Sequence, residues 1–337
     1  MGTPESERTP SEQQGSPTKE KRLYRLWQWG LAYSILVILF GAVVRITGSG
    51  AGCGQHWPTC KGEILHLPQA LETVIELFHR LTSGGALLGS VVLCLLGYRW
   101  STARSVRRSG LAVALFMVGE SLVGAALVLL KYVGDNDSVG RAIIMAAHLL
   151  NTSLLLFAFL SVILSLKARL QPAWMDGMQQ KVDSRESRRW LAFLGTALFG
   201  VVAASGAITA LGDTLYPLQE GAGGWHAAAD TMSLGAHFLV RLRVIHPILA
   251  ISSAGILFWG AGRLGTSALI QKGLRVTVAL QVVAGFMNIA LNAPGWMQVL
   301  HLALANAIWI LWSWLWIEES WLPKRTNHTS SWREAVA

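Results

Sequence analysis

Charged residues are scarce in this chain. Only 14% of its 337 residues are Asp, Glu, Lys or Arg, whereas 52% are hydrophobic. Soluble domains carry about 25% charged residues, so this composition indicates a protein whose solvent is the bilayer. The net charge of +9 does not indicate a nucleic-acid partner, because the basic residues stand in short clusters between apolar runs, where they set membrane orientation.

The beginning of the chain lacks the features of a cleavable leader. Residues 1–22 are polar and rich in Ser, Pro and Glu, with neither the apolar core nor the cleavage site of a signal peptide. We interpret them as a disordered cytoplasmic tail.

Eight segments are long and apolar enough to cross a membrane, which takes about 20 mostly apolar residues. They are residues 27–44, 78–98, 111–130, 142–166, 190–211, 238–259, 270–291 and 297–317. Basic residues intrude on the ends of the sixth and seventh segments, but their long side chains can reach the headgroups. The sequence therefore predicts an all-α membrane protein.

Lysine and arginine are unevenly divided between the two sets of loops. Of the 28, 21 fall in the two tails and in the loops after the second, fourth and sixth segments. Because cytoplasmic loops carry the basic excess, both termini are predicted to be cytoplasmic in a multi-pass protein of the bacterial inner membrane. The loops around Cys53, Asp135, Gly223 and Pro294 would then face outward.

The two halves of the sequence share motifs in the same order. The paired motifs are "FGAVV" (40–44) with "FGVVA" (199–203), "ESLVGAALVLL" from Glu120 with "QVVAGFMNIAL" from Gln281, and "HLLNTSLLLF" from His148 with "HLALANAIWILW" from His301. Four segments per half predict two parallel repeats, each a four-helix bundle. We expect a tail at 1–22, an N-terminal half at 23–170, a cytoplasmic linker at 171–189, a C-terminal half at 190–320 and a tail at 321–337.

Four of the nine histidines lie within apolar segments. They are His79, His148, His246 and His301, on the even-numbered segments and near the outward end of each. The repeat pairs the first two and the last two. Two neutral imidazoles that face each other across a bundle fit axial ligation of haem iron. The alternative is a histidine bonded to a neighbouring helix, and zinc is disfavoured because no pair has the close spacing of common zinc sites. For the other five we expect solvated or interfacial roles: His56, His66, His226, His237 and His328.

The two histidine pairs differ in their neighbours. Glu76 stands three residues before His79, and Arg243 stands three before His246, so each shares a helix face with its histidine. A carboxylate suggests proton movement or stabilisation of a developing cation in the first half, whereas the second half would hold a haem as electron carrier. The alternative for Glu76 is an interfacial ion pair with Arg80. Basic residues that could pair with haem propionates, or merely reach the interface, are Arg45, Arg80, Lys131, Arg141, Arg241 and Arg243.

Four further residues attract attention. Cys53 and Cys60 lie seven positions apart in the first outward loop, where an oxidising exterior permits a disulfide, structural or redox-active. Cys94 lies in an apolar segment and is expected to fill space. Glu120 is the one carboxylate at mid-membrane and is matched by Gln281 in the second half. Such a group is either functional or protonated and hydrogen-bonded to a neighbouring helix.

Several motifs together resemble the haem A synthase family. They are "GAVVRITGSGAGCGQHWPTC" (41–60), "IELFHR" (75–80), "HLLNT" (148–152), "GAITALGDTLYP" (206–217), "RLRVIHP" (241–247) and "HLALANA" (301–307). The resemblance implies oxidation of the C8 methyl group of haem O to the formyl group of haem A, through successive hydroxylations, for terminal oxidase assembly.

The resemblance also implies roles for individual residues. His79 and His148 would face the substrate haem with Glu76 as the catalytic carboxylate, and His246 with His301 would ligate haem b. Cys53 and Cys60 match the paired cysteines of one branch of the family. Glu120 departs from the glutamine that the family pattern has in the third helix.

Partners follow from the same resemblance. Haem O would be the substrate, and candidate partners are haem O synthase, subunit I of the terminal oxidase, membrane lipid and further copies of this chain. One alternative is a dihaem b-type cytochrome that transfers electrons from quinol, although a symmetric electron carrier needs neither Glu76 nor an outer cysteine pair. Another is a haem transporter, which should show polar breaks deep in its helices, where only Glu120 hints at one.

Overall fold

Eight long helices dominate the computed structural model, which describes residues 17–63, 69–180, 188–217 and 235–321. Each is long and apolar enough to cross a membrane, so the predicted all-α membrane protein is confirmed. In lipid a helix satisfies its own backbone hydrogen bonds, which is why apolar runs of this length become helices. The eight are α1 (Pro17–Ile46), α2 (Leu71–Trp100), α3 (Arg104–Leu129), α4 (Val139–Leu170), α6 (Arg189–Leu215), α8 (Phe238–Ala261), α9 (Ala268–Ala290) and α10 (Gly295–Trp321).

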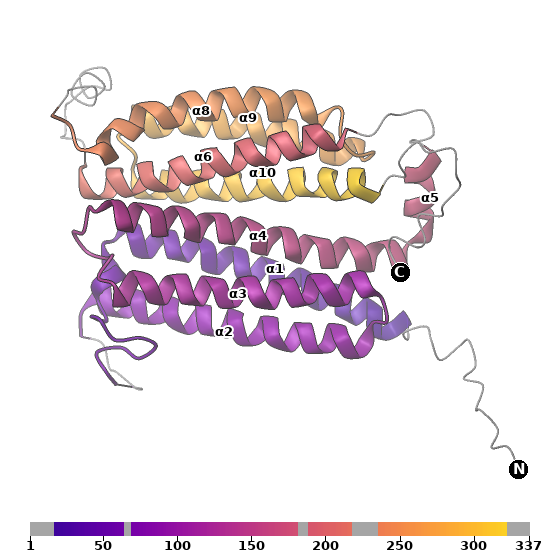
Figure 1. Ribbon diagram of the computed structural model, residues 1–337, viewed down its shortest axis with the longest axis horizontal. Helices are drawn as coiled ribbons and strands as arrows, with labels where there is room; N and C mark the ends of the chain where they lie inside the picture. The colour runs from indigo at the N-terminus through magenta and orange to yellow at the C-terminus, as the bar shows by residue number, and fades with distance from the viewer. Residues whose placement is uncertain (1–16, 64–68, 181–187, 218–234, 322–337) are drawn as a thin grey trace, which may run out of the picture.

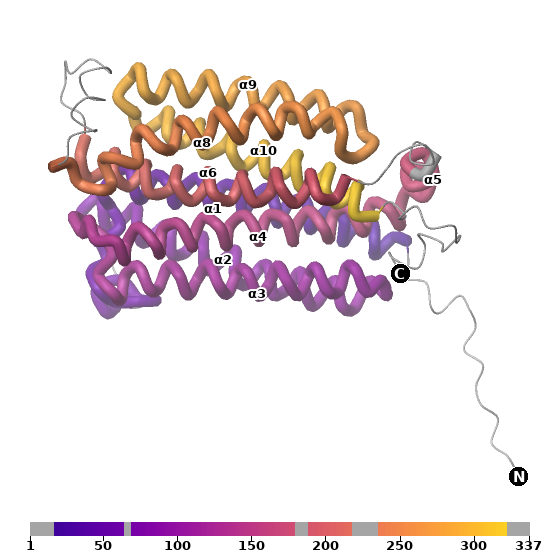
Figure 2. Tube along the Cα trace, turned by 45° about the horizontal axis from the view of Figure 1, so that its top comes forward, coloured from indigo at the N-terminus to yellow at the C-terminus, as the bar shows by residue number. Residues whose placement is uncertain are grey.

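The helices form two groups that lie side by side. Helices α1 to α4 make one group, and α6, α8, α9 and α10 make the other (Figures 1 and 2). Helices α1 and α4 of the first group pack against α6 and α10 of the second. The order of the spans therefore matches the two predicted halves, whereas a symmetry relation between the halves stays a prediction.

Trp309 and Arg45 join helices of the two groups by hydrogen bonds. Trp309 on α10 donates its indole N–H to the carbonyl of Ser153 on α4 at 2.6 Å. Arg45, near the end of α1, donates to the Ala210 carbonyl at 2.7 Å and to the Thr214 hydroxyl at 2.6 Å, both on α6. The same guanidinium donates to Gln298 Oε1 on α10 at 2.9 Å. One cation thus ties three helices of both groups together.

The first helix begins earlier than expected. It starts at Pro17, inside the stretch that we assigned to a disordered tail, so the tail prediction is wrong for residues 17–22. Proline suits the first helical position, and buried Glu20 anchors this turn by accepting hydrogen bonds from Ser101 Oγ at 3.2 Å and Arg169 Nε at 3.0 Å. Residues 1–16 lie outside the described residues.

Short helices occupy two of the connections. A 3₁₀ turn, η2 (Ser49–Ala51), follows α1, and α5 (Pro172–Gln180) forms much of the described part of the expected linker between the halves. The remainder of that linker at 181–187, the loop around Gly223 and the tail from 322 lie outside the described residues.

Large buried side chains gather toward one end of both groups. The three largest fully buried side chains are Trp27, Phe159 and Trp312, each in the half of its helix that adjoins the α5 end. Toward the opposite end, where α2, α4, α8 and α10 begin, five buried residues are alanines. These are Ala42, Ala125, Ala142, Ala207 and Ala284. Bulky aromatic packing therefore stabilises the α5 end, whereas at the other end small alanines stand beside a separate apolar cluster around buried Leu211 and Leu239.

Candidate functional site

The four intramembrane histidines lie in one layer. Helices α2, α4, α8 and α10 all begin at the same end of the molecule, which we call the histidine end (Figure 1). Each histidine is between the seventh and the tenth residue of its helix. At about 1.5 Å rise per residue, all four stand roughly 9 to 14 Å from the start of their helices. The matching depth expected from the sequence is present.

The histidines also come together in the expected pairs. His79 and His148, both in the first group, are close enough for their charges to interact, and the same holds for His246 and His301 in the second. The Nδ1 atoms of His79, His148 and His301 are buried without a hydrogen bond of good geometry among the described residues, although a carboxylate lies close to that of His148. A buried ring nitrogen without a protein partner fits a residue that binds a ligand atom.

Glycines lie directly against three of the four rings. A Cβ atom added at Gly41 would be 3.2 Å from His79 Cε1, one at Gly206 would be 2.9 Å from His246 Cε1, and one at Gly285 would be 3.5 Å from His301 Cε1. Ordinary carbon contacts are about 3.5 to 4.0 Å, so the first two positions require glycine if the rings are to keep their places. Sequence reasoning missed this role of the glycines.

The glycines also correct one of the repeat motifs. The sequence comparison matched "FGAVV" with "FGVVA", which pairs Gly41 with Gly200. In the structure a Cβ at Gly200 would meet Leu150 at 3.6 Å, whereas Gly206 is the residue that lies against His246 as Gly41 lies against His79. The contacts with the histidine rings therefore favour a match between the segments that begin at Gly41 and Gly206.

Three of the rings have a polar neighbour. Glu120 Oε2 on α3 is 2.6 Å from His148 Nδ1, Ser205 Oγ is 3.0 Å from His246 Nδ1, and Gln281 Nε2 is 3.1 Å from His301 Nε2. Metal-binding histidines usually bond a protein group through the second ring nitrogen, which fixes the orientation of the ring. The four rings, their glycines and their polar neighbours thus form a donor set that fits haem iron in both groups.

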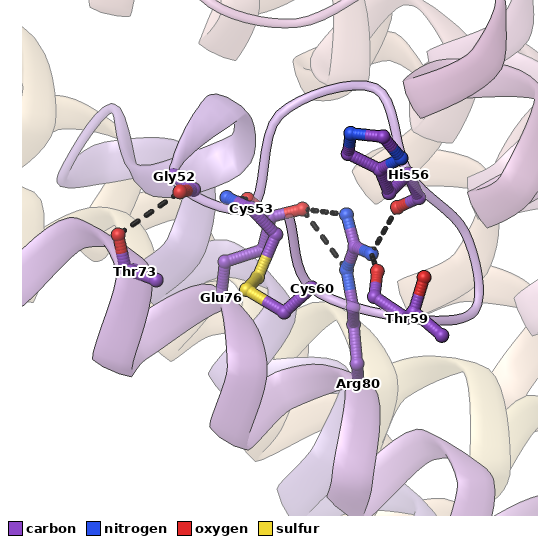
Figure 3. The surroundings of a disulfide bond; sticks show 8 residues. All are labelled: Gly52, Cys53, His56, Thr59, Cys60, Thr73, Glu76 and Arg80. Atoms are coloured by element: carbon purple, nitrogen blue, oxygen red, sulfur yellow. Dashed lines mark hydrogen bonds and ion pairs between the residues drawn. A yellow bond between two sulfur atoms is a disulfide. The ribbon is translucent and has the colours of Figure 1, made fainter. Parts of the chain in front are cut away.

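Glu76 lies beneath the loop that carries the cysteine pair (Figure 3). Cys53 and Cys60 form the expected disulfide, and both are almost fully buried. The backbone N–H of Cys53 donates to Glu76 Oε2 at 2.7 Å. Arg80 donates to the other oxygen of Glu76 and also to the carbonyl of Thr59 at 2.6 Å. The ion pair with Arg80, which the sequence offered as the alternative role for Glu76, is therefore present, and it holds the disulfide loop against α2.

Four basic residues near the histidine end donate hydrogen bonds to protein groups. Arg243 donates through Nε to Asp213 Oδ1 at 2.7 Å and through Nη2 to the carbonyls of Gly212 and Tyr216, so it closes the end of α6. Arg141 donates to the carbonyls of Gly134 at 2.6 Å and Asn136 at 2.7 Å. Arg45 and Arg80 have the partners given above. For these four residues a propionate would have to replace an existing protein partner.

The free cysteine Cys94 and the described loop histidine His237 lie outside the two paired sites. Cys94 is a half-buried free thiol on α2. His237 accepts from the N–H of Leu239 at 3.5 Å at the start of α8, and its Nε2 is 3.6 Å from Asp137 Oδ2. His66, His226 and His328 lie outside the described residues. The expectation that these residues take no part in the paired sites stays a prediction.

The fold and these contacts define a class: a multi-pass membrane protein with two paired-histidine sites in one layer. Residues 25–313 match the model of the COX15-CtaA family, which is described as "Cytochrome oxidase assembly protein". The match spans most of the sequence, and the chain belongs to this family. Membership of this family indicates a role in cytochrome oxidase assembly. The family resemblance drawn from the sequence motifs is confirmed.

Named relatives refine the comparison. "Protoheme IX farnesyltransferase" of Thermus thermophilus is 44% identical over 294 residues, which is 85% of this chain and 46% of that protein. "Heme A synthase" of Bacillus cereus is 42% identical over 95 residues, which is 28% of this chain and 30% of that protein. The chain thus spans about half the length of the Thermus relative.

Proposed function

We propose that this chain acts as a haem A synthase, which oxidises the C8 methyl group of haem O to the formyl group of haem A. The observation that supports this proposal most is the combination of two histidine pairs at one depth with a buried carboxylate, Glu76, one turn from the first pair only. A symmetric dihaem electron carrier needs no such difference, and the family match does not favour that alternative.

In the proposed reaction the first group binds the substrate. His79 and His148 face the iron of haem O, and Gly41 allows the His79 ring to approach α1 closely. In a balanced scheme each of two hydroxylations takes one oxygen atom from water and releases two electrons, which pass to an external one-electron acceptor, and two protons. The resulting hydrated aldehyde loses water to form the formyl group. Glu76 is the proposed catalytic carboxylate: it takes up a proton or stabilises positive charge that develops on the substrate. Arg80 and the Cys53 N–H hold it in place.

The second group is proposed to hold haem b between His246 and His301. When bound, that haem supplies one-electron transfer. Ser205 and Gln281 orient the two rings from the side. We also propose that Arg243, one turn from His246, belongs to this haem-binding site. Its ion pair with Asp213 fixes the end of α6.

We further propose that haem O reaches this chain from a protohaem farnesyltransferase. The support is the Thermus relative of that name. The match covers 85% of this chain but only 46% of that relative. Haem A would pass on to subunit I of a terminal oxidase. In the membrane, the proposed orientation has both termini in the cytoplasm, so that both histidine pairs lie near the outer face.

The decisive experiment is haem extraction from bacterial membranes that make haem O but no haem A. Expression of the full chain should produce haem A, identified by chromatography and mass spectrometry. Glu76→Gln keeps the size of the side chain and should leave haem O or its hydroxylated product in place of haem A. Glu72→Gln is the matched control, because Glu72 is an exposed carboxylate one turn earlier on α2.

Two results would contradict the proposal. Full haem A production by Glu76→Gln would remove the catalytic role of that carboxylate. Membranes in which the wild-type chain binds haem in both groups yet forms no haem A would favour the dihaem cytochrome.

A further inference from the structure

A carboxylate lies beside one histidine of the first group and has no counterpart in the second. Glu120 Oε2 on α3 is 2.6 Å from His148 Nδ1 on α4. At the matching place in the second group, Gln281 on α9 brings its amide to His301 at 3.1 Å, and it meets the Nε2 atom rather than Nδ1. The two sites therefore differ in the charge, and in the ring nitrogen, at this contact.

The carboxylate of Glu120 has its own set of donors. Asn151 Nδ2 donates to Glu120 Oε1 at 2.7 Å, and Thr152 Oγ1 lies 3.0 Å from the same oxygen. Asn151 also donates to the Phe116 carbonyl at 2.9 Å, which fixes its amide against α3. A half-buried carboxylate is costly in an apolar layer unless polar contacts compensate it, and here Oε1 accepts hydrogen bonds while Oε2 lies at ion-pair distance from His148.

These donors are specific to the first group. In the paired motifs that begin at His148 and His301, the residues that correspond to Asn151 and Thr152 are Leu304 and Ala305. Neither of those side chains can donate a hydrogen bond. The first group thus supplies side-chain donors to a carboxylate, whereas in the second group the amide of Gln281 is itself the polar contact to His301.

We propose that Glu120 is a positioning residue of the first site, which accepts the Nδ1 hydrogen of His148 and so presents Nε2 to the porphyrin iron. The inference rests on the proposed function, in which His148 is an iron ligand. A carboxylate on the far side of a ligating imidazole fixes its tautomer and makes the ligating nitrogen more basic. A more basic ligand favours ferric over ferrous iron, so the first site has the lower reduction potential for this reason.

A swap of the two side chains tests the inference. The full chain is purified in detergent and titrated with haemin, the ferric protoporphyrin. Glu120→Gln gives the first site the amide of the second and should weaken haemin binding at one of the two sites by about 10- to 100-fold. A tenfold loss of ferric relative to ferrous affinity raises the midpoint potential of that site by about 59 mV, measured by spectroelectrochemistry. Gln281→Glu is the matched control and should alter the other site alone.

Two further variants keep the outcomes distinct. Thr152→Val preserves side-chain volume and removes one donor to Glu120. It should raise the midpoint potential of the first site by less than Glu120→Gln does. If Glu120→Gln does not fold, the Thr152→Val result tests the inference in its place. His148→Ala tests the ligand itself. If His148→Ala abolishes the first-site spectrum while Glu120→Gln and Thr152→Val leave potential and affinity unchanged, the inference is overturned and the ligand assignment stands. If His148→Ala leaves that spectrum unchanged, both are overturned.

Discussion

Gly206→Ala offers a sharp test of the second histidine pair. The new Cβ would lie 2.9 Å from His246 Cε1 and 3.5 Å from each ring nitrogen. Because carbon atoms rest at about 3.5 to 4.0 Å, the ring has to move by roughly 0.6 Å or more. Ligand distances in metal sites tolerate only about 0.2 Å, and the 3.0 Å contact between Ser205 Oγ and His246 Nδ1 would be disturbed by the same movement.

The expected result is a loss of haem from the second site. We expect haemin affinity there to fall at least about tenfold, the magnitude typical for a disturbed metal-ligand environment, while the first site is unchanged. The assay is an absorbance titration of the purified full chain with haemin, accompanied by a thermal melt that verifies folding. Gly200→Ala is the matched control, because its Cβ would meet Leu150 at an ordinary 3.6 Å. Unchanged haemin affinity in a folded Gly206→Ala protein would refute the reasoning.

Two further predictions concern the helix core and an exposed ion contact. Gly195→Ala should lower the free energy of unfolding by about 1 to 3 kcal/mol, because its Cβ would clash with the ring of Trp312. Gly255→Ala, whose Cβ would meet nothing within 4 Å, should leave the same thermal melt unchanged or raise its midpoint. The hydroxyl of Tyr216 donates to Asp137, and this bond, followed by the charge of His237, lowers the pKa of that carboxyl below 3.8. The small contribution of the ionised Asp137 carboxylate to stability is present above pH 3.8 and is lost as the pH falls through the lowered pKa. Tyr216→Phe should therefore flatten the acid limb of a plot of melting temperature against pH. An unchanged acid limb would contradict this prediction.

Patterns along single helices were predictable from the sequence. Apolar runs of membrane-spanning length need no tertiary information, and neither does the depth of a histidine such as His148, which depends on its position in its own helix. The disulfide was also predictable, because Cys53 and Cys60 are the two cysteines in one short loop. The predicted segments are nevertheless shorter than the helices, since polar turns such as the one around Glu20 are stabilised by contacts with other helices.

Contacts between helices were harder to predict. Gly200 and Gly206 are both helical glycines, and the register of α6 against α8 determines which of them meets His246. Arg243 shares a face with His246, as expected, but its partner Asp213 lies on another helix and could not be recognised from spacing. The role of Glu120 was likewise open until α3 and α4 were seen to bring it to His148.

Arg45 limits how the two helix groups can move. Its guanidinium donates to α6 and α10 from the end of α1, and moving the groups apart would leave that cation without partners near the apolar layer. Such a charge is costly in a bilayer. Transporters with two related halves work by rocking one half against the other around a central substrate, which requires an interface that opens easily. A charged tie across the interface opposes that movement and suits a protein whose two sites keep a constant separation.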